Sequence, residues 1–240
     1  MRVAATTLVV GALAGAADAA AAEIAAAGTL AAPFGPPIDD ERVYLHALLD
    51  EFEYRSAGGM NSGRWEGEAW AGTDIDRLWI KSEGEIVRDG AVTHGQHEVS
   101  YDRPITAYFD LQAGMRLDLH SGPTRQWAAL GIEGLAPYFI HLSATAYAGG
   151  GARYAAKLLA TDDLLVTQRL ILQTQLELNA YSRADPARGI DGGVADLEFG
   201  MRLRYEIRKK FAPYAGVGFI RNKAGAANEV LFAVGLRLWL

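Results

Sequence analysis

The stretch VADLEFGMRLRYEI, residues 194–207, decides the fold of this chain. Its apolar and polar residues alternate with a period of two, which places the two sets on opposite faces of an extended strand. Charged residues such as Glu198 and Arg202 occupy one face, and residues such as Leu197 and Leu203 occupy the other. Strands of soluble proteins are about 5–6 residues long, whereas a tilted membrane strand needs about 9–11. The stretch therefore predicts a long strand with one charged face and one apolar face.

The same alternation recurs along the chain, for example in residues 106–119 and 169–181. An apolar exterior around a charged interior is what a closed barrel in lipid requires, because closure satisfies every backbone hydrogen bond. We therefore predict an all-β fold, a transmembrane antiparallel up-and-down β-barrel of about twelve strands. A soluble antiparallel sandwich with one solvated face is the alternative. The predicted strands are 43–54, 64–73, 77–87, 96–103, 106–119, 125–134, 138–148, 153–162, 168–181, 194–207, 212–221 and 229–240.

The links between these strands form two alternating sets, as expected for short turns on the periplasmic side and longer loops outside. The tight links are predicted at 74–76, 103–105, 135–137 and 209–211, and the longer ones at 55–63, 88–95, 182–193 and 222–228.

The composition excludes several classes of protein. Lys and Arg number 23 against 29 Asp and Glu, a net charge of −6 without a basic block, so we predict no nucleic-acid partner. The absence of cysteine excludes disulfides, iron–sulfur clusters, thiolate zinc sites and cysteine nucleophiles. From Asp39 onward there is no run of 18 apolar residues, which excludes a helical membrane protein.

The first residues predict export. Residues 1–19 have one basic residue, an apolar run and an Ala-x-Ala motif, the layout of a secretory signal peptide. Residues 20–38 are rich in Ala, Gly and Pro and predict a linker without a core. The barrel domain is predicted to span 39–240. We expect it to be exported through the periplasm to the outer membrane of a Gram-negative bacterium.

Several phrases of the sequence resemble the outer-membrane copper resistance protein B family. They are WAGTDIDRLWIKSEGE (70–85), YFDLQAGMR (108–116), GIEGLAPYF (131–139), LLVTQRLILQ (164–173), DLEFGMRLRYEIR (196–208) and FAPY (211–214). The resemblance implies a barrel that takes part in copper homeostasis, with copper ions, outer-membrane lipid and periplasmic copper proteins as partners. Members of the family often carry a Met/His-rich segment before the barrel. Residues 20–38 lack one, so the resemblance does not extend to a periplasmic copper-loading arm.

Two carboxylates are the first candidates for contact with copper. Glu83 and Glu85 share a face by the i, i+2 rule and lie in a family-like phrase. Strand parity places both in the lumen, where carboxylates attract divalent cations. Lys81 and Arg77 share the same face, so pairing of Glu83 with Lys81 competes with metal binding.

Four histidines complete the predicted metal-ligand set, because imidazole gives copper a selectivity that oxygen ligands lack. His94 and His97 are three residues apart, so in an extended strand they point to opposite faces and only a turn makes them co-ligands. His46 and His141 are both predicted to face inward.

One sequence feature favours a different function. His141-Leu142-Ser143 has the H-x-S spacing of outer-membrane phospholipases, but Ile140 and Leu142 occupy the lipid-facing parity and no Asn occurs between 61 and 179. We predict that the protein is not an enzyme. A structural or small-solute barrel without a metal role is the main alternative, and a lipid-acting enzyme is the second. The direction of copper movement, its oxidation state and the oligomeric state stay open.

Overall fold

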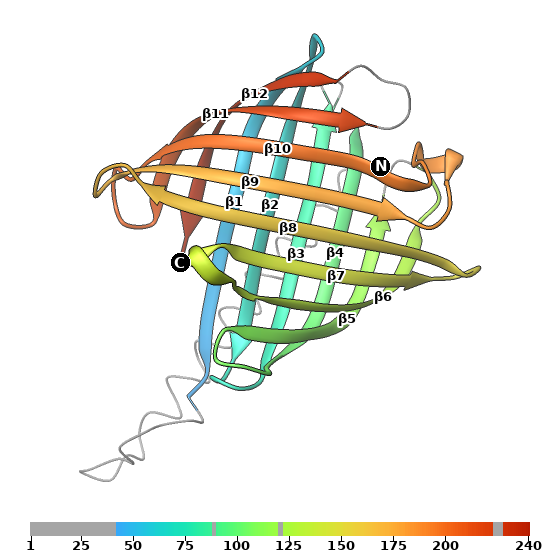
Figure 1. Cartoon of the computed structure of the whole chain (residues 1–240), viewed down its shortest axis with the longest axis horizontal. Helices are drawn as coiled ribbons and strands as arrows, with labels where there is room; N and C mark the ends of the chain where they lie inside the picture. The colour runs from blue at the N-terminus through green and yellow to red at the C-terminus, as the bar shows by residue number, and fades with distance from the viewer. Residues whose placement is uncertain (1–41, 88–89, 120–121, 223–227) are drawn as a thin grey trace. The chain divides into compact units, whose positions relative to one another are not determined.

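The computed structural model describes residues 42–87, 90–119, 122–222 and 228–240. Over these residues the chain forms one closed antiparallel barrel in which each strand pairs with its neighbours in sequence and β1 pairs with β12 (Figure 1). The predicted all-β up-and-down barrel of twelve strands is confirmed. The strands are β1 (Tyr44–Ala57), β2 (Met60–Gly72), β3 (Arg77–Val87), β4 (Val92–Pro104), β5 (Phe109–Leu119), β6 (Arg125–Leu135), β7 (His141–Gly149), β8 (Arg153–Leu165), β9 (Leu170–Tyr181), β10 (Gly193–Tyr205), β11 (Phe211–Asn222) and β12 (Glu229–Trp239).

Two short 3-10 turns, η1 (Pro137–Phe139) and η2 (Pro186–Arg188), lie in links between strands. Within the described ranges, no helix has the length and apolar character needed to span a bilayer. The predicted signal peptide (1–19) and linker (20–38) lie outside the described residues and stay predictions.

The two ends of the barrel differ in their links. We call the end at which β1 begins and β12 ends the terminal end, and the opposite end the far end. Links at the terminal end, such as 73–76 and 166–169, are all short. The longest link, 182–192 between β9 and β10, lies at the far end, as predicted.

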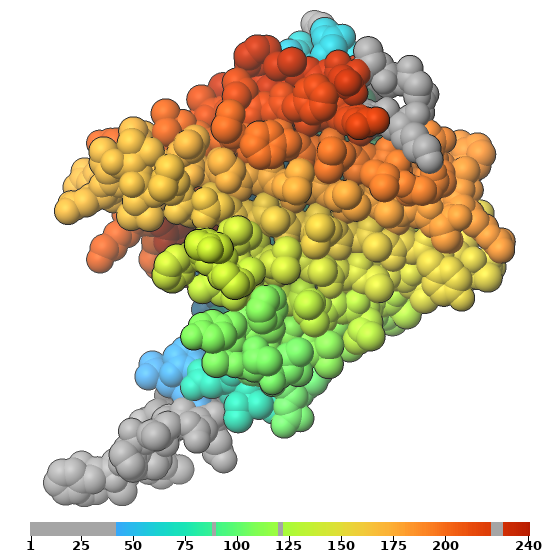
Figure 2. Space-filling view, in the orientation of Figure 1, coloured from blue at the N-terminus to red at the C-terminus, as the bar shows by residue number. Residues whose placement is uncertain are grey.

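The barrel is apolar outside and charged inside, the reverse of a soluble core. Large apolar side chains such as Phe52, Met115 and Val234 stand exposed on the outer face, whereas Arg116 and Glu51 are almost completely buried in the lumen. Figure 2 shows the outer face of β5 to β11 as a continuous wall of side chains. This distribution fits a bilayer around the wall, because lipid solvates the apolar face.

A bulge in β1 changes which residues face the lumen. The register of β1 against β2 shifts between Leu49 and Glu51. Asp50 and Glu51 both reach the lumen as a result: Asp50 pairs with Arg237 at 2.8 Å and Glu51 with Arg202 at 2.6 Å. A classic bulge places two residues opposite one, so strict alternation does not predict this pair of inward carboxylates.

Two of the predicted long links are wrong. The 55–63 link is a two-residue turn, because β1 continues to Ala57 and β2 begins at Met60. Gly58 and Gly59 have φ of 56° and 79°, the left-handed geometry that a two-residue hairpin of the I′ type demands. The 88–95 link is also shorter, because β4 begins at Val92 and includes His94.

Candidate functional site

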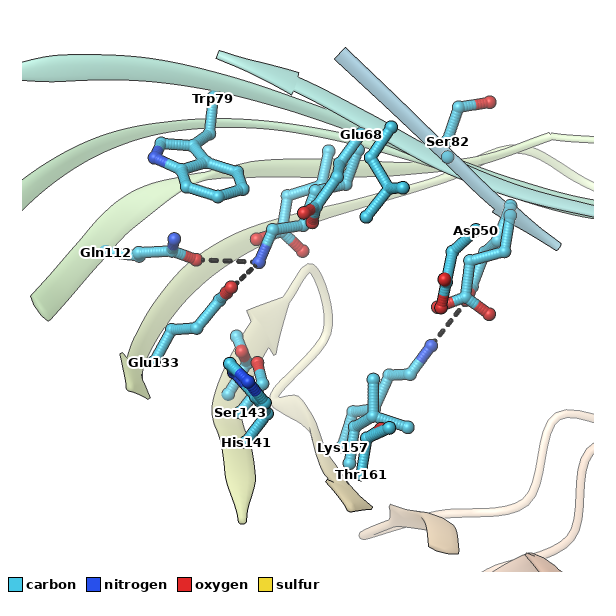
Figure 3. A pocket seen from close by; sticks show the side chains of 18 of the residues that line it. Asp50, Glu68, Trp79, Ser82, Gln112, Glu133, His141, Ser143, Lys157 and Thr161 are labelled. Atoms are coloured by element: carbon cyan, nitrogen blue, oxygen red, sulfur yellow. Dashed lines mark hydrogen bonds and ion pairs between the residues drawn. The ribbon is translucent and has the colours of Figure 1, made fainter. Parts of the chain in front are cut away.

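A cavity of about 430 Å³ occupies the terminal half of the lumen (Figure 3). Its lining includes His141, the first residue of β7, and Asp110, close to the start of β5. Solvent reaches the lumen from this end: the side chains of Glu133 and Asp163 are 28% and 34% exposed, whereas that of Arg116, deeper in, is 2% exposed.

More carboxylates than cationic side chains line the cavity, although three arginines behind the lining, Arg64, Arg77 and Arg204, form ion pairs with four of these carboxylates. Four cationic side chains line it, namely Lys81, Arg116, Lys157 and Arg237. Nine carboxylates line it, namely Asp50, Glu66, Glu68, Glu83, Glu98, Asp102, Asp110, Glu133 and Asp163. An excess of carboxylates in a narrow, low-dielectric lumen concentrates cations.

The predicted pairing of Glu83 with Lys81 is wrong. Lys81 Nζ instead donates to Glu133 on β6 and to Gln112 Oε1 at 2.9 Å, as Figure 3 shows. Glu83 pairs with Lys157 of β8, whose Nζ lies 2.5 Å from Glu83 Oε2. The reason is the closure of the barrel, which brings β8 across the lumen to β3 although 74 residues separate the two side chains.

Lys157 sits in a group of three carboxylates. Ligand atoms of Glu66, Glu83 and Glu177 all lie within 4.8 Å of one another. Lys157 Nζ lies 3.4 Å from Glu177, and Arg64 contacts Glu66 and Glu177 at 3.0 and 3.1 Å. The ammonium therefore neutralises the charge that a metal ion would neutralise there, and an ion could enter this group only by displacing Lys157.

Two ionisable residues of the lining have no side-chain hydrogen bond or ion pair with a described residue. Glu68 on β2 and His141 on β7 form no side-chain hydrogen bond or ion pair with another residue that the structure describes, and both line the cavity. Figure 3 shows both among the side chains that line the cavity. A carboxylate and an imidazole without partners are the groups most available to a cation. Sequence reasoning proposed His141 but did not single out Glu68, because parity places Glu68 in the lumen without saying whether a cation faces it.

The other predicted ligands lie elsewhere. His46 packs against Trp70, with ring centroids 5.9 Å apart, and does not line the cavity. Glu85 shares the lumen face with Glu83 but does not reach the cavity either, and its cross-strand neighbour is His94.

His94 and His97 both lie on β4 and face opposite sides, as the spacing predicted. His94 Nε2 lies 3.0 Å from the side chain of Gln96, on the lumen face. His97 Nδ1 lies 3.0 Å from Ser82 Oγ, which also accepts a hydrogen bond from Trp65 Nε1. Gln96 and Glu98, the residues on either side of His97, are buried and line the cavity, so strand alternation places His97 on the outer face. The six predicted ligands therefore do not form one site, and only Glu83 and His141 line the cavity.

Ion pairs with almost no exposed side-chain surface line the far half of the lumen. Glu53, whose side chain is fully buried, accepts hydrogen bonds from Arg202 at 3.1 Å and from the Tyr214 hydroxyl at 2.9 Å. Glu51 pairs with Arg202 and, at 3.0 Å, with Arg64. At the inner edge of the cavity, Arg116 packs over the ring of Tyr147 and pairs with Asp118 at 2.7 Å.

Together these features define a class of protein. A closed barrel with an apolar outer face, an even number of long strands and a charged lumen is an outer-membrane β-barrel. The sequence matches the family described as "Copper resistance protein B precursor (CopB)" over residues 43–239. The chain belongs to this family, and its place is the outer membrane.

The curated relatives agree with this assignment. "Copper resistance protein B" of Escherichia coli is 36% identical over 215 residues, which cover 85% of this chain and 72% of that protein. "Copper resistance protein B homolog" of Pseudomonas syringae pv. tomato is also 36% identical over 215 residues, covering 85% of this chain and 73% of that protein.

Solved structures support the fold alone. The "NanC porin" structure matches with a TM-score of 0.55 at 13% identity, covering 81% of this chain and 99% of that chain. The "KdgM porin" matches with a TM-score of 0.51 at 13% identity, covering 80% and 98%. The family match supports a copper-resistance barrel. His141 and Ser143 line the cavity on its lumen side, whereas a lipid-acting pair would face the bilayer.

Proposed function

We propose that this barrel takes copper ions into its lumen cavity through the terminal end. The observation that carries the proposal is the set of nine carboxylates around a solvent-accessible cavity with four cationic side chains. The volume of about 430 Å³ far exceeds the ~30 Å³ of one water molecule, so a copper ion enters together with water. Membership of the copper resistance protein B family supports copper as the cargo.

The terminal end is proposed to face the periplasm. Short turns face the periplasm in bacterial outer-membrane barrels and longer loops face outward, and the longest described link lies at the far end. Copper then enters from the periplasmic side, where periplasmic copper proteins are the expected donors.

Glu68 and His141 are proposed as the first copper ligands. Neither has to give up an ion pair to bind a cation, unlike Glu83, which pairs with Lys157. Imidazole and carboxylate oxygen together suit Cu(II), which prefers nitrogen and oxygen ligands in a tetragonal arrangement. Glu83 is proposed to strengthen the field of the cavity and not to coordinate the metal while Lys157 holds it.

The test is copper titration of the refolded barrel under aerobic and anaerobic conditions, with bound metal counted. We expect Glu68→Gln and His141→Ala each to weaken copper binding by about tenfold or more, as losing one ligand does in metal sites. Glu85→Gln is the matched control, because Glu85 faces the lumen outside the cavity. Binding of less than about one ion per barrel in both redox states, or equal losses for Glu68→Gln and Glu85→Gln, would contradict the proposal. Liposome swelling with uncharged sugars would favour a general solute barrel instead.

A further inference from the structure

The link between β9 and β10 folds across the far mouth of the barrel. It contains η2 and a small closed loop in which Asp185 and Ile190 exchange backbone hydrogen bonds of 2.8 and 3.1 Å. Gly189 ends η2 with φ of 69°, which permits the sharp return. Ile190 packs against the aromatic cluster of Trp127, Tyr147 and Tyr181 inside the far half of the lumen. We call residues 182–192 the cap.

The carboxylate of Asp185 ties the cap to two other strands. It accepts a bidentate pair of hydrogen bonds from Arg125 of β6, at 2.8 and 3.3 Å, and one from Arg153 of β8 at 2.5 Å. The Asp185 side chain is 8% exposed although it belongs to a link. Bidentate arginine–carboxylate pairs are among the strongest and most directional polar contacts in proteins.

Arg188 fixes the other side of the cap. Its side chain is buried and donates to the backbone carbonyl of Pro123 at 2.9 Å, in the link after β5. The carbonyl of Ala187 approaches Gly122 so closely that a Cβ on Gly122 would stand 2.3 Å from it. The cap is therefore docked on β5, β6 and β8 as well as on its own strands, and it lies above a layer of ion pairs and aromatic rings.

We propose that the cap is a latch that closes the lumen toward the far side, held by the Asp185 carboxylate, so that the cavity exchanges ions through the terminal end alone. Release of Asp185 from Arg125 and Arg153 frees the cap from the β6–β8 wall. The inference rests on the proposed function only for the identity of the ion and for which end faces outward. Closure itself follows from the contacts of the cap.

Trypsin applied to intact cells tests the latch, because the protease stays outside the outer membrane. Arg183 is exposed, whereas Arg188 is buried in the docked cap. We expect the wild-type chain to be cut after Arg183 and to resist cleavage after Arg188. Asp185→Asn and Asp185→Ala should raise the rate of cleavage after Arg188 by about tenfold or more, since a lost charge-assisted contact shifts a two-state equilibrium by about that factor. Asp191→Asn is the control, because Asp191 lies in the cap and its side chain has no partner among the described residues.

Conductance in planar bilayers gives a second measurement. We expect the wild-type barrel to conduct in rare, brief openings, and the two Asp185 variants to stay open about tenfold longer. Equal cleavage after Arg183 and Arg188 in the wild type would overturn the latch, as would Asp185 variants that change neither cleavage nor conductance. Cleavage at neither arginine in the variants, with conductance raised, would overturn the outward orientation alone. Copper titration of the wild type and of the same variants separates the two proposals. A barrel whose latch behaves as expected but that binds no copper contradicts only the proposed function.

Discussion

The two halves of the lumen are built from the same kinds of residue and have opposite properties. In the terminal half, Lys81 and Glu133 pair at the edge of a cavity and keep about a quarter of their side-chain surface exposed. In the far half, Glu53 and Arg202 pair in a closely packed interior with almost no exposed side-chain surface. The difference lies in packing and exposure, because both halves pair most of their carboxylates with cations but only the terminal half keeps open volume beside them.

This comparison indicates how one barrel can both hold shape and attract ions. A buried charge is tolerated only with full partners, so the ion pairs of the far half hold the strands of the barrel wall together. Glu68, a carboxylate without an ion pair, lies in the hollow terminal half, where water can solvate it. The excess negative charge is therefore found where solvent and cations can reach it.

The largest expected effect is on stability in the filled half. Glu53→Ala removes the acceptor shared by Arg202, Arg55 and Tyr214. Both arginines then depend on Glu51 and Glu198 alone for their ion pairs in a buried interior. We expect a loss of about 3–5 kcal/mol in the free energy of unfolding. Urea titration in bilayers measures it. Glu68→Ala in the hollow half should change the free energy of unfolding by no more than about 0.5 kcal/mol, because Glu68 has no hydrogen bond or ion pair with a described residue to lose. Equal losses in the two variants would remove the distinction between the halves.

The next largest effect is the difference in stability between an arginine introduced on the outer wall and one introduced in the lumen. Leu203 stands exposed on the outer face, so Leu203→Arg places a charge in lipid and should cost about 2–4 kcal/mol near the midplane. Ser143→Arg points into the cavity, where there is room and water, and should cost less. Gln175 is unsuited to this comparison because it accepts a hydrogen bond from Arg202 at 2.5 Å in the filled half. If the bilayer titration gives the same cost at Leu203 and Ser143, the assignment of the two faces is wrong.

Most of the fold could be predicted from the sequence because a membrane strand must alternate. The stretch 194–207 overlaps β10, and each of the other eleven strands overlaps a predicted strand. The errors lie where local geometry overrides the pattern. Gly58 and Gly59 read as part of a loop but form a two-residue turn, and the bulge after Leu49 turns Asp50 and Glu51 to the same side.

The candidate site was predicted only in part, for a different reason. Parity says which face a residue occupies, but tilt and stagger of the strands decide which residues meet across a closed barrel. The pairing of Glu83 with Lys157 and its approach to Glu177 therefore have no signal in one sequence. His141 could be proposed because a histidine is rare and its parity is clear. Glu68 could not be separated from the other inward carboxylates.

A smaller effect is expected where the two halves meet. Lys157→Met leaves Glu66, Glu83 and Glu177 close together without their ammonium, so their repulsion should lower the free energy of unfolding by about 1–3 kcal/mol. Millimolar divalent cations should restore most of this loss, because an ion then replaces the ammonium. Lys81→Met is the control, since Glu133 is not part of that group. The same recovery in both lysine variants would show that cations act on the whole lumen and not on this group.

The smallest effect is expected from pH at the cap. The hydrogen bond from Arg125, with the charge of Arg153, lowers the pKa of the Asp185 carboxyl below its ordinary value of 3.8. A group with a lowered pKa contributes its full stabilisation above the ordinary value and loses it as the pH falls through the lowered one. The two facing groups are guanidiniums, which stay charged throughout. Conductance that depends on the latch should therefore be constant between about pH 8 and 5 and rise only below 3.8, with no such rise in Asp185→Asn. If the conductance of the wild type instead changes with a midpoint near neutral pH, the group that controls closure is a histidine or a lumen carboxylate, and not Asp185.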